Sequence, residues 1–446
     1  QAVGNRVKIV DRKSREVPCG TVGEIMVKGD NITKEYIKAL GHSSFTLTFY
    51  SAPNLFDTKR LIALTDQIVK QVHKIDLVLS FHSDSATYAG FIIREHLNIE
   101  TYDLPTTEYL KYFDKLLMKE NIINNTPRVL TPKFTSLADP HLFEFVEFIE
   151  FPVMVKKRKS AGSRGVFKVD SMAEFQTLYK SIRTKDKYLV EKYHEGMIVR
   201  LDGRVKHGVI DLFIPSVHHT SPYHYYKNGN IRISSQRFIQ TIGKERLRTF
   251  AQDICSNLNM VNSIFHHEVI WSNDTLYFME TTIRPGGGMV DYIYKTLYNF
   301  SQKDHFYALQ MYQGTLPKPK NYPYDHNNFI EPKETYAIVL YPYLDGDQYS
   351  FQKVSFTQSI EDLFQKKRYS TFRHYIANRN MTKDKTRFLM PYETFHPVLS
   401  CYFIGKPEYI ERQLKKFTKE FHVRVDAKKS LANAMIPRKL LKAGSL

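Results

Sequence analysis

Two glutamates could share one face of a β-hairpin in the segment FHHEVIWSNDTLYFMETTIR, residues 265–284. A three-residue loop, with Ser272 paired to Leu276, would set the register of the two strands. In this register Glu268 lies directly opposite Glu280, with Cβ atoms about 4.5–5.5 Å apart. Two such carboxylates repel each other unless a basic partner or a divalent cation lies between them, and oxygen ligands suit Mg²⁺. The hairpin is therefore a candidate metal site, although a register shifted by one residue would put the glutamates on opposite faces.

Two glycine-containing loops could bind anions. The segment FPVMVKKRKSAGSRGVFKV, residues 151–169, places a small, basic loop between two apolar runs. Amides of such a loop can point at phosphate oxygens while flanking lysines add charge, but a solvated hairpin explains an isolated loop equally simply. In the second loop Arg284 and Pro285 precede three glycines, residues 286–288. A planar, bidentate cation there could stabilise developing negative charge.

The elements that must position these residues form an alternating pattern at the start of the chain. We expect strands at residues 24–29, 45–51 and 76–80 and helices at residues 32–40, 58–72 and 85–97, which together predict a small parallel sheet. A long polar helix is expected over residues 106–123. Strands follow at residues 128–130, 153–157 and 188–193, and a capping box of Ser171 and Glu174 predicts a helix to residue 183.

Composition restricts the class of protein. The chain has 446 residues, 42% of them hydrophobic, which predicts several folded domains. No long apolar run or signal peptide is visible, so we expect a soluble, cytoplasmic protein without a membrane partner. The three cysteines lack zinc-site spacing. The net charge of +18 is spread along the chain without a nucleic-acid-binding motif, so we expect a small anionic ligand rather than nucleic acid.

The order of the motifs resembles that of the ATP-grasp carboxylate–amine ligases. It runs from PVMVK and SAGSRGV through the capping-box helix and YLVEKY to FHHEV and METTIRPGGG, and the resemblance covers residue 76 to the C-terminus. It implies an α/β fold, α+β in places, with a small Rossmann-like N-terminal domain, a central lid subdomain and a C-terminal ATP-grasp subdomain. It also implies ATP and Mg²⁺, with Mn²⁺ as an alternative. The activity implied is amide formation between a small carboxylate and an amine through an acylphosphate, with release of ADP and phosphate.

The resemblance assigns a role to each candidate residue. The nucleotide would be bound by Lys115, Lys156, the lid residues Ser160, Gly162, Ser163 and Gly165, and the adenine hinge of Glu191, Lys192, Tyr193 and His194. The metal would be bound by Glu268, Glu280 and Thr282. Arg284 would be catalytic, beside the γ-phosphate and the substrate carboxylate.

The same resemblance divides the chain into successive parts. We expect an N-terminal pre-ATP-grasp domain over residues 45–105, a lid and adenine-hinge subdomain over 106–195, and a subdomain with the metal site over 196–315. A C-terminal α/β region over 316–430 and a basic tail over 431–446 complete the expected order. Dimers are common in similar ligases.

Two positions depart from the family pattern and leave other functions open. Thr282 stands where the family usually has Asn, and Ile198 where relatives often carry an acid. A nucleotide-binding module with degenerate catalysis is therefore one alternative. A biotin-carboxylase-like or purine-pathway enzyme is another, although no biotin-acceptor Met-Lys-Met motif is visible.

Residues 1–44 form a separate segment. Residues 1–40 resemble part of the acyl-adenylate-forming enzymes around a G-E-I-x-V-x-G motif, although Glu35 replaces a glycine usual there. Either the chain is part of a larger biosynthetic polypeptide with an upstream adenylating domain, or the segment supplies the first strand and helix of the N-terminal domain.

Overall fold

The structure is a computed structural model that describes the backbone of residues 7–10, 24–27, 57–73, 75, 78–80, 84–99, 106–125, 128–160, 165–218, 230–233, 236–287, 290–312, 334–341, 352–356, 372–377, 386–389, 399–420 and 423–427. The chain divides into two compact units, Gln1–Ile75 and Asp76–Leu446. The six parts expected from the sequence, and the boundaries between them, stay predictions.

The first unit contains one small sheet and one helix among its described residues. Strands β1 (Val7–Val10) and β2 (Glu24–Val27) pair antiparallel, so the parallel pairing expected in this region does not hold for these strands. Helix α2 (Thr58–Val72) has the predicted bounds, and the Asp57 carboxylate accepts a hydrogen bond from the Arg60 amide at its start. The helix and strand expected at residues 32–40 and 45–51 lie outside the described residues.

The second unit begins with helices that carry residues of the candidate site. Helix α3 (Asp84–His96) was expected; the three described residues of the predicted strand before it, 78–80, are not in a strand. The predicted long helix is divided into α4 (Thr106–Tyr109), a 3₁₀ turn (Leu110–Tyr112) and α5 (Lys115–Asn125). The break occurs at Asp114, whose carboxylate accepts hydrogen bonds from the Leu116 amide and the Arg158 guanidinium. That side chain begins a new helix rather than continuing the old one.

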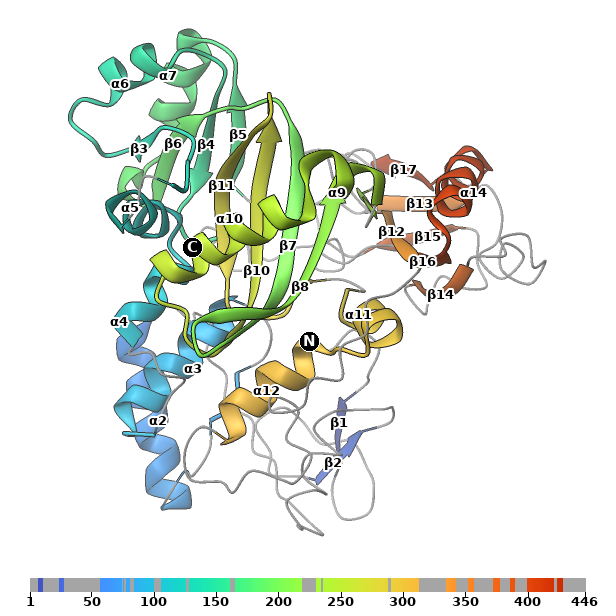
Figure 1. The fold of residues 1–446 in the computed structure, drawn as a ribbon. Helices are drawn as coiled ribbons and strands as arrows, with labels where there is room; N and C mark the ends of the chain where they lie inside the picture. Colours follow the sequence, from blue (N-terminus) through green and yellow to red (C-terminus); the bar gives the residue numbers. More distant parts are fainter. Residues whose placement is uncertain are drawn as a thin grey trace. The chain divides into compact units, whose positions relative to one another are not determined.

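A four-stranded antiparallel sheet follows, in the order β3-β6-β4-β5. Its strands are β3 (Phe134–Ser136), β4 (Val153–Lys157), β5 (Val166–Val169) and β6 (Tyr188–Lys192). Helices α6 (Leu142–Ile149) and α7 (Met172–Ser181) pack on it, with Val146, Phe175 and Val155 fully buried in the shared core (Figure 1). The Ser171 hydroxyl accepts from the Glu174 amide, which confirms the predicted cap. The strand predicted at residues 128–130 is wrong; β3 lies four residues beyond it.

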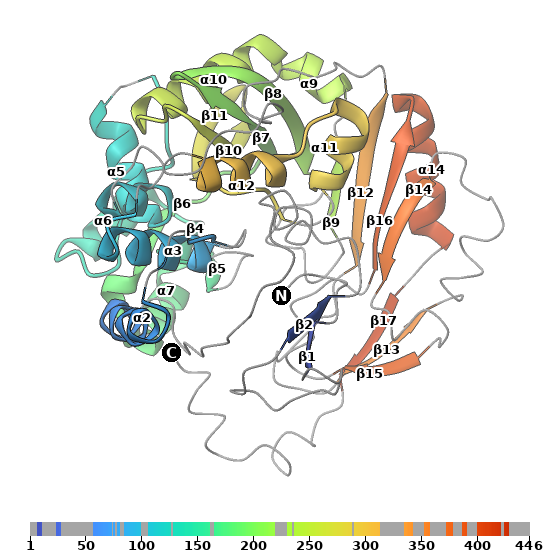
Figure 2. The same ribbon diagram turned by 90° about the horizontal axis from the view of Figure 1, so that it is seen from below.

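The largest sheet has eight strands in the order β11-β10-β7-β8-β9-β12-β16-β14. They are β7 (Met197–Lys206), β8 (Val209–His218), β9 (Asn230–Ile233), β10 (Ser263–Ser272), β11 (Thr275–Thr282), β12 (Thr335–Tyr341), β14 (Phe372–Ala377) and β16 (Leu399–Gly405). Helices α9 (Gln236–Ile242) and α10 (Lys244–Asn257) cover one face, and α11 (Val290–Tyr298) and α12 (Gln302–Tyr312) lie on the other (Figure 2).

The C-terminal part adds α14 (Pro407–Glu420) and a three-stranded sheet in the order β15-β13-β17. Its strands are β13 (Gln352–Phe356), β15 (Thr386–Leu389) and β17 (Val423–Ala427). At the end of the chain β16, α14 and β17 follow one another as strand, helix and strand, but the two strands belong to different sheets. Among the described helices, none is long and apolar enough to cross a membrane.

Candidate functional site

Strand alternation places two charged side chains on the same face of the four-stranded sheet. Val155 on β4 and Val190 on β6 belong to the core under α6 and α7. Because successive side chains of a strand point to opposite faces, Lys156 and Glu191 must point away from that core. They meet there, with Lys156 Nζ 2.5 Å from Glu191 Oε1.

Helix α5 brings two more lysines to this face. Lys115 and Lys119 are four residues apart and so lie one above the other on the helix. Lys119 Nζ is 3.2 Å from Glu191 Oε2, and both side chains are almost fully buried. Burial alone would raise the pKa of Glu191, but Lys119 and Lys156 together hold it at about 2. The three side chains form an ionised cluster with one positive charge in excess.

The hairpin that carries the glutamate pair has the predicted pairing but a different turn. Glu268 lies opposite Glu280, as expected. The three-residue loop, however, is wrong: Ser272 pairs with Thr275 across a two-residue turn, because Asn273 and Asp274 both adopt left-handed conformations, with φ of 47° and 57°.

A β-bulge corrects the register between the turn and the glutamates. Val269 pairs with Phe278, whereas the neighbouring Glu268 pairs with Glu280, so Met279 is the extra residue. The backbone of Phe278 is held from outside the hairpin: its amide donates to Leu130 O at 2.7 Å, and its carbonyl accepts from Lys119 at 3.2 Å. Without the extra residue, Glu268 would face position 279 and Glu280 would point to the other face.

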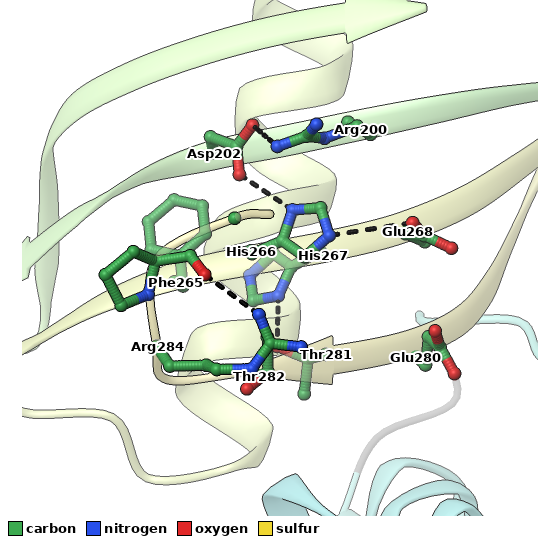
Figure 3. Close-up of polar contacts among 12 residues, drawn as sticks. Arg200, Asp202, Phe265, His266, His267, Glu268, Glu280, Thr281, Thr282 and Arg284 are labelled. Carbon is green, nitrogen blue, oxygen red and sulfur yellow. Dashed lines mark hydrogen bonds and ion pairs between the residues drawn. The ribbon is translucent and has the colours of Figure 1, made fainter. Parts of the chain in front are cut away.

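Each glutamate has a basic partner. Lys115 Nζ lies 2.9 Å from Glu280 Oε2 and also donates to the Ser160 carbonyl at 2.6 Å. The Nε2 atom of His266 lies 3.5 Å from Glu268 Oε1, as Figure 3 shows. The Glu280 carboxylate thus has an ammonium partner, and the Glu268 carboxylate has an imidazole partner.

The glycine loop is described at its two ends. Ser160 at the start donates its hydroxyl to Lys157 O, and Gly165 at the end has φ of +68°, a conformation that favours glycine. The Gly165 carbonyl accepts from the Lys157 amide, so the two ends lie side by side. Gly162 and Ser163 lie outside the described residues.

The residues predicted as an adenine hinge lie at the end of β6 and directly after it. The Lys192 ammonium donates to the Glu150 carbonyl at 3.1 Å, and the Tyr193 hydroxyl donates to Glu195 at 2.6 Å. The His194 ring stacks on Tyr277 of β11 with centroids 4.0 Å apart. Burial lowers the pKa of His194, which favours the neutral ring.

Thr282 and Arg284 share one acidic partner that the sequence analysis missed. Asp84, the first residue of α3, accepts from Arg284 Nε at 2.8 Å and Nη2 at 2.6 Å. The Thr282 hydroxyl donates to the same carboxylate at 3.0 Å. No local sequence signal connects Asp84 with residues so distant along the chain.

A buried network extends from the glutamate pair under the Gly286 loop. Asp202 accepts from His266 Nδ1 at 2.7 Å and from Arg200 at 2.7 Å (Figure 3). The Tyr294 hydroxyl donates to it as well. Burial would raise the pKa of Asp202, but Arg200 and His266 hold it far below its usual range. A Cβ atom on Gly286 would come within 2.5 Å of Arg200 Nη2, so a larger residue there would force the Arg200 side chain to move.

The donor set fits a divalent cation in part. No group of three or more His, Cys, Asp or Glu side chains close enough to hold a metal occurs in the part of the chain that the structure describes. Glu268 and Glu280 supply two carboxylates, and the Lys115 ammonium beside Glu280 shows that this position suits positive charge. Mg²⁺ typically takes one or two carboxylates and completes its shell with substrate phosphates and water.

Comparison with known proteins gives matches in structure alone. No family model and no curated protein matches the chain. The L-amino acid ligase of Bacillus licheniformis superposes with a TM-score of 0.62 at 16% identity, covering 83% of this chain and 85% of that one. N5-carboxyaminoimidazole ribonucleotide synthetase of Thermotoga maritima superposes with a TM-score of 0.54 at 14% identity, covering 83% of this chain and 86% of that one.

A third similar structure contains a nucleotide. The biotin carboxylase domain of 2-oxoglutarate carboxylase from Hydrogenobacter thermophilus, in complex with MgADP and bicarbonate, superposes with a TM-score of 0.56 at 13% identity, covering 87% of this chain and 82% of that one. These comparisons give no support to the resemblance of residues 1–40 to acyl-adenylate-forming enzymes. They show that the chain has the ATP-grasp fold.

Proposed function

We propose that the protein is an ATP-dependent ligase that joins a small carboxylate to an amine. The observation that carries this proposal is the meeting of an opposed glutamate pair with buried lysines, which suits a metal–triphosphate complex. Lys115 and Lys156 would contact the phosphates, and the loop from Ser160 through Gly162 and Ser163 to Gly165 would cover them. Glu191, Lys192, Tyr193 and His194 would form the adenine hinge.

The reaction would proceed in two balanced steps. A carboxylate oxygen attacks the γ-phosphorus of ATP, the bond to the β–γ bridging oxygen breaks, and ADP leaves. The amine then attacks the acylphosphate carbonyl carbon, the carbon–oxygen bond breaks, phosphate leaves, and the ammonium proton passes to phosphate or solvent. Glu268 and Glu280 would hold Mg²⁺, which would neutralise phosphate charge. Arg284 would stabilise the charge that develops at the acyl and phosphoryl oxygens.

The names of the similar structures support this choice of reaction. An amino acid ligase and a carboxyaminoimidazole ribonucleotide synthetase are enzymes, and a related domain binds MgADP. Amino acids and small biosynthetic acids are therefore the first substrates to test.

A nucleotide-binding module without turnover is the second candidate. The observation that favours it is Thr282, whose hydroxyl is bonded to Asp84. If the hydroxyl keeps that partner in the loaded state, the metal would have only the two glutamates as protein ligands.

ADP release with Mg-ATP and pools of amino acids and small carboxylates separates the two candidates. We expect release by the wild-type protein that requires both an acid and an amine, and we expect its loss in Glu280→Gln. Added hydroxylamine should trap the acylphosphate as a hydroxamate. Glu144→Gln, at an exposed position on α6, is the matched control and should behave as wild type. ATP binding without release in every pool would favour the module.

A further inference from the structure

Asp84 and Arg284 form a two-pronged ion pair at the edge of the candidate site. Nε and Nη2 of Arg284 each donate to one oxygen of the carboxylate, at 2.8 Å and 2.6 Å. The side chains are 11% and 15% exposed, so the pair is largely shielded from water and yet reachable by a ligand. Asp84 comes from the start of α3, Arg284 from the segment after β11.

Among the residues that the structure describes, the contacts of Arg284 leave one edge of its guanidinium available. A guanidinium has five N–H donors in a plane. Asp84 takes two of them along the side of the group, and Nη1 donates a third to the Pro285 carbonyl at 2.9 Å. The two remaining hydrogens, one on Nη1 and one on Nη2, form the end of the group. That end matches a carboxylate or a phosphoryl group, which it can bind through two parallel hydrogen bonds.

Asp84 itself is held in place and ionised. The Thr282 hydroxyl donates to Oδ1 at 3.0 Å, so the carboxylate is fixed by β11 as well as by its own helix. Burial alone would raise the pKa of Asp84, but Arg284 and Thr282 outweigh it and lower the pKa below its usual value. Lys115 contributes to this lowering, and Glu280 to the raised pKa of Arg284. The pair therefore borders the corner where Lys115 meets Glu280.

We propose that Asp84 is a positioning residue, which occupies the side of the Arg284 guanidinium and aims its free end at one planar oxyanion of the substrate. This rests on the proposed function, in which the oxyanion is the substrate carboxylate or the acylphosphate made from it. Thr282 acts with Asp84 by fixing the carboxylate. The threonine at the position where similar enzymes have Asn thus acquires a role in orienting Arg284. If Asp84 instead occupied the place of the substrate carboxylate, its removal in Asp84→Asn would strengthen binding of the acid.

Modification by phenylglyoxal tests the ion pair without any activity. The neutral guanidine is the nucleophile that attacks the carbonyl carbons of the reagent, so a carboxylate partner, which favours the protonated form, slows the reaction. We compare labelling rates of individual arginines by peptide mass spectrometry in Asp84→Asn, Asp84→Glu and Asp211→Asn. Asp211 is the matched control, because it pairs with Arg204 through the same two-pronged contact, at 2.9 Å and 2.5 Å.

We expect Asp84→Asn to label faster at Arg284 by about tenfold, the scale of one hydrogen bond to a charged group. Asp84→Glu should remain near the wild-type rate. Asp211→Asn should accelerate labelling at Arg204 and leave Arg284 unchanged. An unchanged rate at Arg284 in Asp84→Asn would overturn the proposal, and so would faster labelling at all buried arginines, which would indicate general unfolding.

Steady-state kinetics test how the orientation of Arg284 affects the reaction of the acid. With the acid identified from the pools, we expect Asp84→Asn to lower kcat/KM for that acid by about 100-fold, the cost of misplacing a reacting group, while the Kd for Mg-ATP is unchanged. Asp84→Glu should recover part of the loss. Tighter binding of the acid by Asp84→Asn would refute the positioning role and support competition. If the wild-type protein releases no ADP in any pool, the proposed function fails, and the labelling rates alone decide whether Asp84 orients Arg284.

Discussion

At the scale of single residues, the Lys115 ammonium occupies the position beside Glu280 at which a metal ion would bind. Its ammonium pairs with Glu280 at 2.9 Å and donates to the Ser160 carbonyl at the base of the glycine loop. A divalent cation at Glu280 must displace this ammonium, whereas nucleotide phosphates offer it a new partner. Nucleotide binding should therefore free Glu280 for the metal, so that the two ligands bind cooperatively.

Replacing this lysine should separate the two effects. We expect Lys115→Met to bind Mn²⁺ more tightly than the wild type without nucleotide and to bind ADP more weakly, each by about tenfold, the scale of one hydrogen bond to a charged group. Free Mn²⁺ measured by electron paramagnetic resonance and ADP titration calorimetry provide the two values. Lys295→Met, at an exposed lysine of α11, is the control. Mn²⁺ affinity that does not rise in Lys115→Met would contradict this competition.

Glu191 should make the stability of its domain sensitive to acid. Its pKa is about 2 in the folded protein because Lys119 and Lys156 outweigh the effect of burial, whereas the unfolded chain takes up the proton near its ordinary value of 4.5. The folded state is therefore stabilised fully above pH 4.5, and this contribution is lost as the pH falls toward 2. The loss is about 1.4 kcal/mol per pH unit within that window.

Urea unfolding of the wild type and Glu191→Gln at pH 5.5 and 3.5 measures this contribution. The single tryptophan, Trp271 on β10, reports unfolding of the domain that holds the site. The difference in unfolding free energy between the two proteins should shrink by about 1.4 kcal/mol from pH 5.5 to 3.5. A difference independent of pH would mean that Glu191 is not ionised between the lysines.

The sequence predicted the charged residues of the site better than their partners. Lys156 lies in a strand whose alternation fixes its face, whereas the shared face of the glutamate pair also depends on the bulge at Met279. Lys119 was missed, although it lies one turn after Lys115 on the helix predicted there. That spacing places both lysines on one face of the helix and could have indicated Lys119. Asp84 could not have been found, because its contact with Arg284 depends on how α3 packs against the segment after β11.

At the scale of elements, the β10–β11 hairpin shows how a local irregularity decides which residues face the site. A two-residue turn of Asn273 and Asp274 in a regular hairpin would oppose Glu268 to position 279. The bulge at Met279 shifts the pairing by one and brings Glu280 back opposite Glu268. The sequence analysis predicted the correct glutamate pairing from a three-residue loop that does not exist, since periodicity cannot distinguish a longer loop from a short turn followed by a bulge.

Two variants distinguish the bulge from a regular hairpin. Deleting Met279 removes the extra residue and leaves the glutamates opposed, so we expect Mn²⁺ affinity in the presence of ADP to stay within about tenfold of wild type, ~1.4 kcal/mol. The double substitution Met279→Glu and Glu280→Met places the second carboxylate where a regular hairpin would need it. It should lose binding, because the bulge points position 279 away from Glu268. Retained binding in the double variant would show that the hairpin is regular in solution.

The helices and strands that the sequence predicted well have strong local signals. Helix α7 begins at the capping box of Ser171, and β4 has the predicted bounds, residues 153–157. The long helix over residues 106–123 failed at Asp114, because the contact of its carboxylate with Arg158 depends on the tertiary structure. For the same reason the sequence could not show that β16 and β17 belong to different sheets.

At the scale of the whole molecule, every described residue of the candidate site belongs to the unit Asp76–Leu446. The site combines α3, α5, two sheets and the segment after β11, which are spread over some two hundred residues of sequence. The net charge of +18 is a property of the whole chain and favours the approach of anionic ligands at low salt. Charge alone does not select the ligand, because nucleic acid and nucleotide are both anionic.

Hydrogen exchange measured by mass spectrometry, with and without Mg-ADP, tests where the nucleotide binds. A ligand that binds the folded state suppresses local opening by RT ln(1 + [L]/Kd), about 2.7 kcal/mol at a hundredfold excess over Kd. We expect slower exchange in peptides that contain β4, β6 and the β10–β11 hairpin, since these strands carry Lys156, Glu191 and the glutamate pair. Peptides from α2 and α14 should be unchanged, because none of the candidate site residues lies in either helix. Glu280→Gln should lose most of the protection on the hairpin and keep more of it on β4, since in the proposed function the metal would hold the hairpin to the nucleotide while Lys156 would contact the phosphates directly. Protection confined to α14, or produced equally by a single-stranded oligonucleotide, would contradict a nucleotide site between these strands.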